Sequence, residues 1–145
     1  MHEDTPYPDP TRHSGYLYLM TPKHHGAGGP AASCWSLAPV DEFRVFDDGD
    51  LHRIVESKKI YGVLKVGDEL QSIGTWQQEV AVFYLPTPPS PPNRWHGHPL
   101  FPVRAALPGN LKRQRMKPSK KVMELLQNAK LITPRQRKRL AKGDH

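Results

Sequence analysis

The amino-acid sequence predicts an α+β fold with a small antiparallel β-meander as its core and a helical pair at the C-terminal end. Three observations lead to this prediction. Short runs rich in β-branched and aromatic residues, separated by Gly-containing turns, lie between residues 60 and 85. Apolar residues at helical spacing follow residue 118. The chain has 145 residues, a length that favours a single domain.

The first 30 residues predict a leader, one strand and a loop. Residues 1–14 contain Pro6, Pro8 and Pro10, and each proline biases the residue before it to an extended conformation. We therefore expect a flexible or extended Pro-rich leader. Residues 16–20 are apolar at every position, which predicts a strand buried on both faces. Residues 23–30, with three glycines and a His pair, predict a surface loop.

The segment 43–57 is predicted to change structure at a cluster of aspartates. Residues 43–46 have the composition of a strand, and Asp47-Asp48-Gly49-Asp50 predicts a turn. Asp50 can then cap a short helix over 51–57. A strand through 52–55 is the alternative.

The core of the predicted sheet lies between residues 60 and 85. Three strands are expected over 60–66, 70–73 and 80–85, with turns at Gly67-Asp68 and Gly74-Thr75. The links between these strands are too short for the crossover that parallel strands need, so antiparallel pairing is predicted.

A proline-rich link and a histidine-containing stretch close the β-rich body, which we place at residues 15–103. The link, 86–92, is expected to be extended and semi-rigid. In the stretch that follows, Gly97 and Pro99 argue against a regular strand. We expect Trp95 and its apolar neighbours to pin the link to the sheet, leaving His96 and His98 at the rim.

Two helices are predicted within a basic arm at residues 104–145. Pro118 suits the first turn of a helix whose apolar stripe comprises Val122, Leu125, Leu126 and Ala129. The second helix, 135–142, is expected to begin with a capping box in which Thr133 and Gln136 bond to each other's backbone N–H. The second helix has few apolar residues, so most of its surface should face outward.

Charge divides the chain into two unlike parts. Residues 1–103 carry 8 Lys and Arg against 12 Asp and Glu, whereas residues 104–145 carry 13 against 2. Such asymmetry predicts an arm that contacts a polyanion or that docks on the acidic body. We predict contacts to nucleic acid, DNA or RNA, mainly through backbone phosphates. The candidate residues are Lys112, Arg113, Arg115, Lys117, Lys120, Lys121, Arg135, Arg137, Lys138, Arg139 and Lys142.

An enzyme is the first alternative, a small hydrolase or a nuclease-like toxin module. His96 and His98 are its candidate acid–base residues, and Cys34 is a candidate nucleophile. Ser33-Cys34-Trp35 resembles the end of the nucleophile motif of papain-like cysteine proteases, which implies a thiolate nucleophile. The Cys-Gly that precedes this motif in the family is missing here, and Pro39 interrupts the helix that would follow.

A protein–protein adaptor is the second alternative, recruiting its partner through the polyproline link or the apolar stripe. His24, His25, His96 and His98 match no standard ligand spacing, and neither metal nor cofactor is predicted. The single cysteine fits a reducing compartment, and no apolar run approaches the length of a membrane span. We therefore expect a cytoplasmic protein without a membrane partner.

Overall fold

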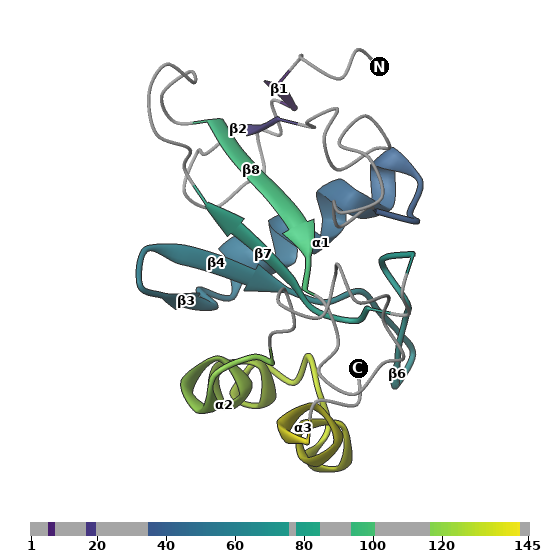
Figure 1. Ribbon diagram of the computed structural model, residues 1–145, viewed down its shortest axis with the longest axis vertical. Helices are drawn as coiled ribbons and strands as arrows, with labels where there is room; N and C mark the ends of the chain where they lie inside the picture. Colours follow the sequence, from purple (N-terminus) through teal and green to yellow (C-terminus); the bar gives the residue numbers. More distant parts are fainter. Residues whose placement is uncertain are drawn as a thin grey trace, which may run out of the picture.

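A computed structural model describes residues 6–7, 17–19, 35–75, 78–84, 94–100 and 117–142 (Figure 1). The predicted leader, the His24-His25 loop and the proline-rich link fall wholly or largely outside these residues. The elements are β1 (Pro6–Tyr7), β2 (Leu17–Leu19), α1 (Pro39–Leu51), β3 (Val55–Glu56), β4 (Lys59–Gly62), β5 (Lys65–Val66), β6 (Glu69–Leu70), β7 (Ala81–Tyr84), β8 (Arg94–Pro99), α2 (Lys120–Asn128) and α3 (Pro134–Ala141).

The predicted α+β fold is confirmed. The main sheet has the strand order β1-β2-β8-β7-β4-β3, and its neighbours from β8 to β3 are all antiparallel. β2 lies beside β8 in parallel, at the place where the sequence predicts a strand buried on both faces. Tyr18, its central residue, is completely buried.

The middle strand of the predicted meander is wrong. The first and third predicted strands, β4 and β7, pair directly with each other. Residues 65–70 instead form a separate two-stranded hairpin of β5 and β6, and of the predicted strand 70–73 only Leu70 belongs to a strand. Gly74 forms an isolated bridge with Trp35, and Thr75 lies in a turn as predicted, although residues 71–73 before it belong to no strand.

Helix α1 corrects the prediction for residues 43–57. The expected strand, the aspartate turn and the start of the expected helix all lie within one continuous helix. Pro39 occupies its first turn, where a missing N–H costs nothing, and Asp41 and Glu42 place negative charge at the positive end of the helix dipole. These are helix-start signals, and they could have identified the element from the sequence.

Close packing of α1 on the sheet explains why a glycine stands inside this helix. A Cβ on Gly49 would collide with the backbone carbonyl of Tyr61, and one on Gly62 would collide with the carbonyl of Val45. The helix and β4 therefore approach each other backbone to backbone. The glycine that suggested a turn permits this approach instead.

The side of the sheet that α1 covers has an aromatic core. Rings pack edge-on, tilted or stacked, with centroids 5.0 Å apart for Phe46 and Phe83 and 5.5 Å apart for Tyr18 and Phe83. We call this cluster the aromatic core. It contains Tyr18, Trp35, Phe43, Val45, Phe46, Ile60, Leu64, Ile73, Ala81, Phe83 and Trp95.

The opposite side of the sheet is covered by α2 and α3, which lie together at one end of the molecule (Figure 1). We call residues 117–142 the helical layer. Val122 and Leu126 of the predicted apolar stripe are fully buried, and Leu125 and Ala129 partly so. The cluster beneath the layer is mainly aliphatic and contains Ile54, Tyr61, Val63, Val80, Val82, Leu100, Val122, Met123, Leu126, Leu131, Ile132 and Leu140.

The histidine-containing stretch is a strand, so the prediction that Gly97 and Pro99 disfavour one is wrong. β8 pairs with β7 along its length from Tyr84↔His96 to Ala81↔Pro99. Gly97 is required because the ring of Phe83 occupies the space where a Cβ would stand. The Gly97 carbonyl also accepts a hydrogen bond of 3.1 Å from Trp35 Nε1. Gly97 thus serves the aromatic core.

Candidate nucleic-acid interface

Capping residues determine where the two helices of the helical layer begin. Thr133 Oγ1 accepts from the Gln136 N–H at 3.1 Å, and Gln136 Oε1 accepts from the Thr133 N–H at 2.8 Å, which confirms the capping box. Ser119 caps α2 by accepting from the Val122 N–H at 3.1 Å. Pro118, expected inside the first turn, lies one residue before this cap.

An ion pair fastens α3 to the sheet. Both terminal nitrogens of Arg139 donate to the carboxylate of Glu79, the second at 3.0 Å to Oε2. The Glu79 side chain is only 10% exposed, so its charge is stabilised mainly by this guanidinium. The bidentate pair gives Arg139 a structural role in holding α3 on the sheet, and its place among the predicted nucleic-acid contacts stays a prediction.

Two further hydrogen bonds join the helical layer to the β5–β6 hairpin. Gln136 Nε2 donates to the Asp68 carbonyl at 2.8 Å, and Lys65 Nζ donates to the Lys130 carbonyl at 3.0 Å. Lys130 sits in the corner between α2 and α3 with a left-handed φ of 60°. The layer is thus anchored at α3 and at its corner, and its orientation on the sheet is defined.

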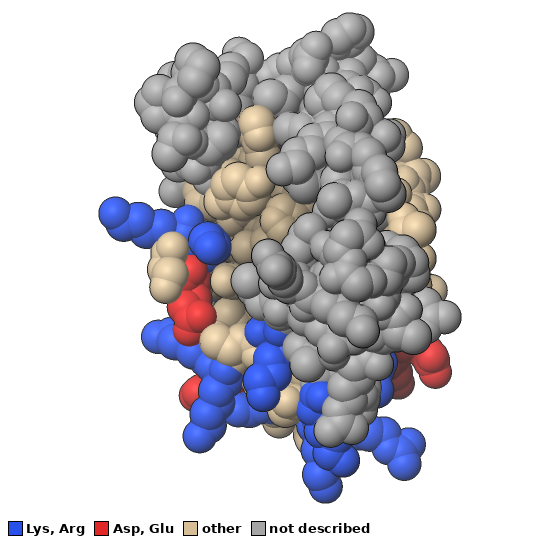
Figure 2. Space-filling model, in the orientation of Figure 1, with Lys and Arg blue, Asp and Glu red and all other residues tan. Residues whose placement is uncertain are grey.

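The outer surface of the helical layer is strongly basic. The layer contains nine Lys and Arg and one acidic residue, Glu124. Blue side chains gather over α2 and α3 in Figure 2, with few red ones among them. Within the described residues, the only ion pair made by a cation of this layer is that of Arg139. The exposed cations are Lys117, Lys120, Lys121, Lys130, Arg135, Lys138 and Lys142.

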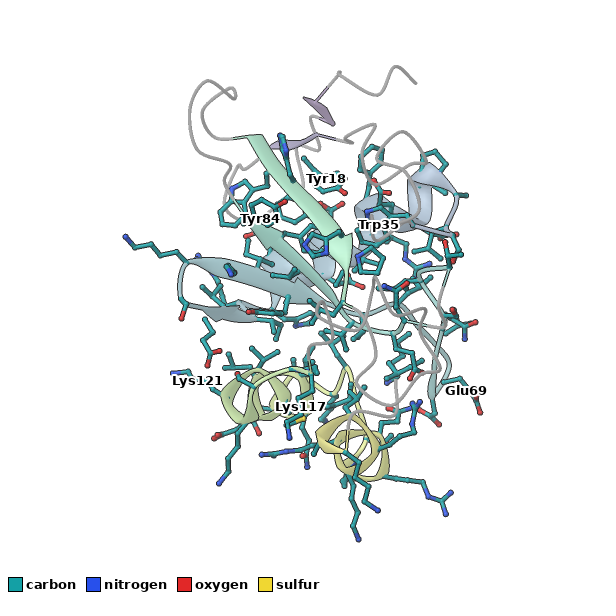
Figure 3. All side chains as sticks on the ribbon, in the orientation of Figure 1. Tyr18, Trp35, Glu69, Tyr84, Lys117 and Lys121 are labelled. Atoms are coloured by element: carbon teal, nitrogen blue, oxygen red, sulfur yellow. The ribbon has the colours of Figure 1, made fainter. Side chains whose placement is uncertain are left out.

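A groove of about 450 Å³ lies between the start of α2 and α3. Figure 3 shows Lys117 between the two helices and Lys121 on the far side of α2. Lys117 Nζ donates to the Ala141 carbonyl at 3.3 Å, and Arg137 donates to Gln127 Oε1 at 3.0 Å. The groove is lined by Lys117, Pro118, Ser119, Lys120, Met123, Arg137 and Ala141.

His96 and His98 project from one face of β8 because they are two residues apart on a strand. Register places His98 opposite Val82, a member of the aliphatic cluster, so both histidines face the side covered by the helical layer. Tyr84 lies opposite His96, and its ring stands edge-on to His98 with centroids 6.0 Å apart. The three rings form a row on the sheet rather than a rim around it.

Burial affects the chemistry of this row. Desolvation lowers the pKa of His96 from its ordinary 6.5 and raises the pKa of Tyr84 from 10.0. His96 Nε2 is buried, and no described residue bonds to it. His98 Nδ1 lies 3.0 Å from the Pro99 carbonyl, an arrangement that favours a proton on this nitrogen. His96 is therefore held as a neutral imidazole at pH 7.

Several predicted site residues lie outside the described residues. These are Cys34, Lys112, Arg113 and Arg115, together with the His24-His25 pair considered as extra metal ligands. Among the described residues, no group of three or more His, Cys, Asp or Glu side chains could hold a metal ion. The described segments also contain no helix long and apolar enough to cross a membrane.

Sequence reasoning missed two features of this surface. Lys130 was not among the predicted contacts, although it stands exposed at the corner between the helices. The groove was also missed, because Ser119, Met123 and Ala141 carry no functional signal in the sequence. Only the packing of α2 against α3 brings them beside Lys117 and Arg137.

Comparisons with known proteins do not extend this description. No family model matches the chain, and neither the curated proteins nor the solved structures searched contain a match. The assignment of a function therefore rests on the residues and geometry described above.

Proposed function

We propose that the protein binds nucleic acid through the helical layer, with backbone phosphates as its main contacts. The observation that carries the proposal is the separation of roles on the two sides of α2 and α3. Their apolar residues are buried against the sheet, whereas seven cations stand exposed with a single acidic residue among them. Exposed cations on an ordered scaffold release counterions when they meet a polyanion.

The form of the surface favours phosphate contacts over base reading. Lysine and arginine dominate the exposed positions of α3, an eight-residue helix. The short polar side chains that read base edges from a recognition helix are few on it. We therefore expect weak sequence preference and steep salt dependence.

The adaptor alternative is less favoured for the apolar stripe, and its other route, the polyproline link, lies outside the described residues. Val122 and Leu126 of this stripe are completely buried between α2 and the sheet. A partner could reach them only if α2 left the sheet.

Binding measured across a salt series tests the proposal. We would titrate the protein with single-stranded RNA, single-stranded DNA and duplex DNA at several salt concentrations. Neutralising Lys120, Lys121, Arg135 and Lys138 together with Gln should weaken binding to all sequences alike. Each lost phosphate contact should reduce the slope of log K against log salt by about 0.7 for single strands.

A matched control separates the effect of the helical layer on binding from the effect of the protein's net charge. Arg44, Arg53, Lys58 and Lys59 are exposed cations of the β-rich body, so converting them to Gln removes the same charge elsewhere. The layer variant should lose far more affinity than this control. Equal losses, or a wild-type protein that binds none of the three nucleic acids, would refute the proposal.

A nuclease is the second candidate, supported by the row of Tyr84, His96 and His98. A neutral His96 at pH 7 is in the form that a general base requires, and the cations of the helical layer would attract a polyanionic substrate to the protein. Incubating labelled RNA and DNA with wild type, His96→Ala and His98→Ala tests this candidate. Cleavage by wild type that is lost in His96→Ala would favour it, and intact substrate throughout would eliminate it.

A further inference from the structure

We propose that the groove between α2 and α3 is a binding site for one sugar-phosphate unit of a single-stranded nucleic acid. This inference rests on the proposed function and names the place where that function is concentrated. The remaining cations of the helical layer then act as a diffuse field that attracts the strand. The groove supplies the directed contact.

The charges around the groove define its ligand class. Among the described residues that line it, the ionisable ones are Lys117, Lys120 and Arg137, and all three are cations. Ser119 adds a hydroxyl that accepts from the Val122 N–H and can donate its own proton elsewhere. Three cations and a hydroxyl around one cavity complement a phosphodiester.

The floor of the groove differs from its charged rim. Pro118, Met123 and Ala141 contribute apolar surface, and Met123 is nearly fully buried. A nucleic-acid strand alternates charged phosphates with less polar sugars, so its repeating unit matches a cationic rim above an apolar floor. The volume of about 450 Å³ lies within the range of small-ligand sites, roughly 300–1,000 Å³.

The strand is favoured over a duplex because the site is hollow. Duplex DNA presents its phosphates on convex ridges with the sugars turned inward, whereas a single strand can enter a groove. Two rim residues are already held in place: Lys117 by the Ala141 carbonyl and Arg137 by Gln127. Arg137 has five N–H donors, so a bond to Gln127 leaves others for a phosphate.

The decisive comparison uses two triple variants with the same charge loss. The groove variant is K117Q/K120Q/R137Q, and the control is K121Q/R135Q/K138Q, whose residues lie on the same helices outside the groove. Affinity for oligo(U) and oligo(dT) would be measured at about 0.15 M salt and at higher salt, where screening shortens the reach of diffuse charge. The groove variant should lose roughly tenfold more affinity than the control, and the gap should persist as salt rises.

A charge-neutral variant tests the cavity itself. Ala141→Leu fills the groove without altering net charge, and circular dichroism with thermal melting would establish that α3 still forms. Binding of oligo(U) should weaken although every cation remains. Unchanged binding by a folded Ala141→Leu protein would overturn the proposal.

Dinucleotides locate the contact directly. UpU and dTpdT each have one phosphodiester, and amide chemical shifts of the wild-type protein should move around Ser119–Met123 and Arg137–Ala141. Inorganic phosphate at the same ionic strength separates the phosphate from its sugars, and the two dinucleotides separate RNA from DNA. Shifts spread evenly over the helical layer, with both triple variants equally weakened, would reject the groove while leaving nucleic-acid binding intact. Absence of binding to any strand would reject both.

Discussion

The two sides of the sheet are built in different ways. On the α1 side, aromatic rings interlock and glycines let the helix touch the strand backbone. On the other side, two short amphipathic helices rest on aliphatic residues and are fastened by Arg139 and Gln136. Of the described cations, most belong to the helical layer on the second side. Under the proposed function, the aromatic side contributes stability and the helical layer is the side that would bind nucleic acid.

This division predicts that damage to the aromatic core acts on stability alone. Phe83→Ala should lower the free energy of unfolding by about 3–5 kcal/mol, since Phe83 is completely buried and contacts several other rings. Chemical denaturation measures the loss. The remaining folded fraction should bind oligo(U) as wild type does, and a selective loss of affinity in that fraction would break the comparison.

A smaller loss is expected from the point where α1 meets β4. Gly49→Ala improves helix propensity by about 1 kcal/mol but pushes a methyl group into the Tyr61 carbonyl. The net result should be destabilisation of roughly 1–3 kcal/mol in denaturant melts. Gly67→Ala is the control: its φ of 62° disfavours alanine, but open space surrounds it. A stabilised Gly49→Ala protein would contradict the close approach.

Much of the helical layer could be predicted from the sequence, because its signals are local. Thr133 and Gln136 are three residues apart, and their capping box depends on nothing else in the chain. The apolar stripe with Val122 and Leu126 likewise follows from helical spacing. The cations were found for the same reason, since charge is read directly from composition.

The features of the fold and of the groove that the sequence did not predict depend on contacts between residues far apart in the chain. Gly49 suggests a turn when read beside its aspartate neighbours, and only the position of Tyr61 shows why a helix needs it. Gly97 suggests a break in a strand until the ring of Phe83 is placed over it. The groove arises from the packing of α2 on α3, and the sequence of neither helix predicts that packing.

An intermediate loss of stability is expected where the ion pair of Arg139 and Glu79 joins α3 to the sheet. Arg139→Gln removes the partner of the largely buried Glu79 carboxylate and should cost roughly 1–3 kcal/mol of stability. Restoring a neutral pair with Glu79→Gln in the same protein should recover part of that loss. Thermal melts of the single and double variants provide the measurement. Additive losses would show that the ion pair does not hold α3 to the sheet.

The smallest expected effect is on the pH dependence of the protein's stability. Because burial lowers the pKa of folded His96, the unfolded chain takes up a proton more readily as pH falls below 6.5. The stability contributed by neutral His96 is therefore complete above pH 6.5 and is lost as pH falls through its folded pKa. Denaturant melts across this range should show a shallower decline for His96→Gln than for wild type. Identical pH profiles would contradict the buried neutral imidazole.

The most direct test of the account is the salt dependence of oligo(U) binding by wild type, the layer variant K120Q/K121Q/R135Q/K138Q and the body variant R44Q/R53Q/K58Q/K59Q. We predict tight binding by wild type at low salt, a steep linear decline with log salt, and a clearly shallower slope for the layer variant alone. Equal slopes for the layer and body variants would contradict the assignment of binding to the helical layer.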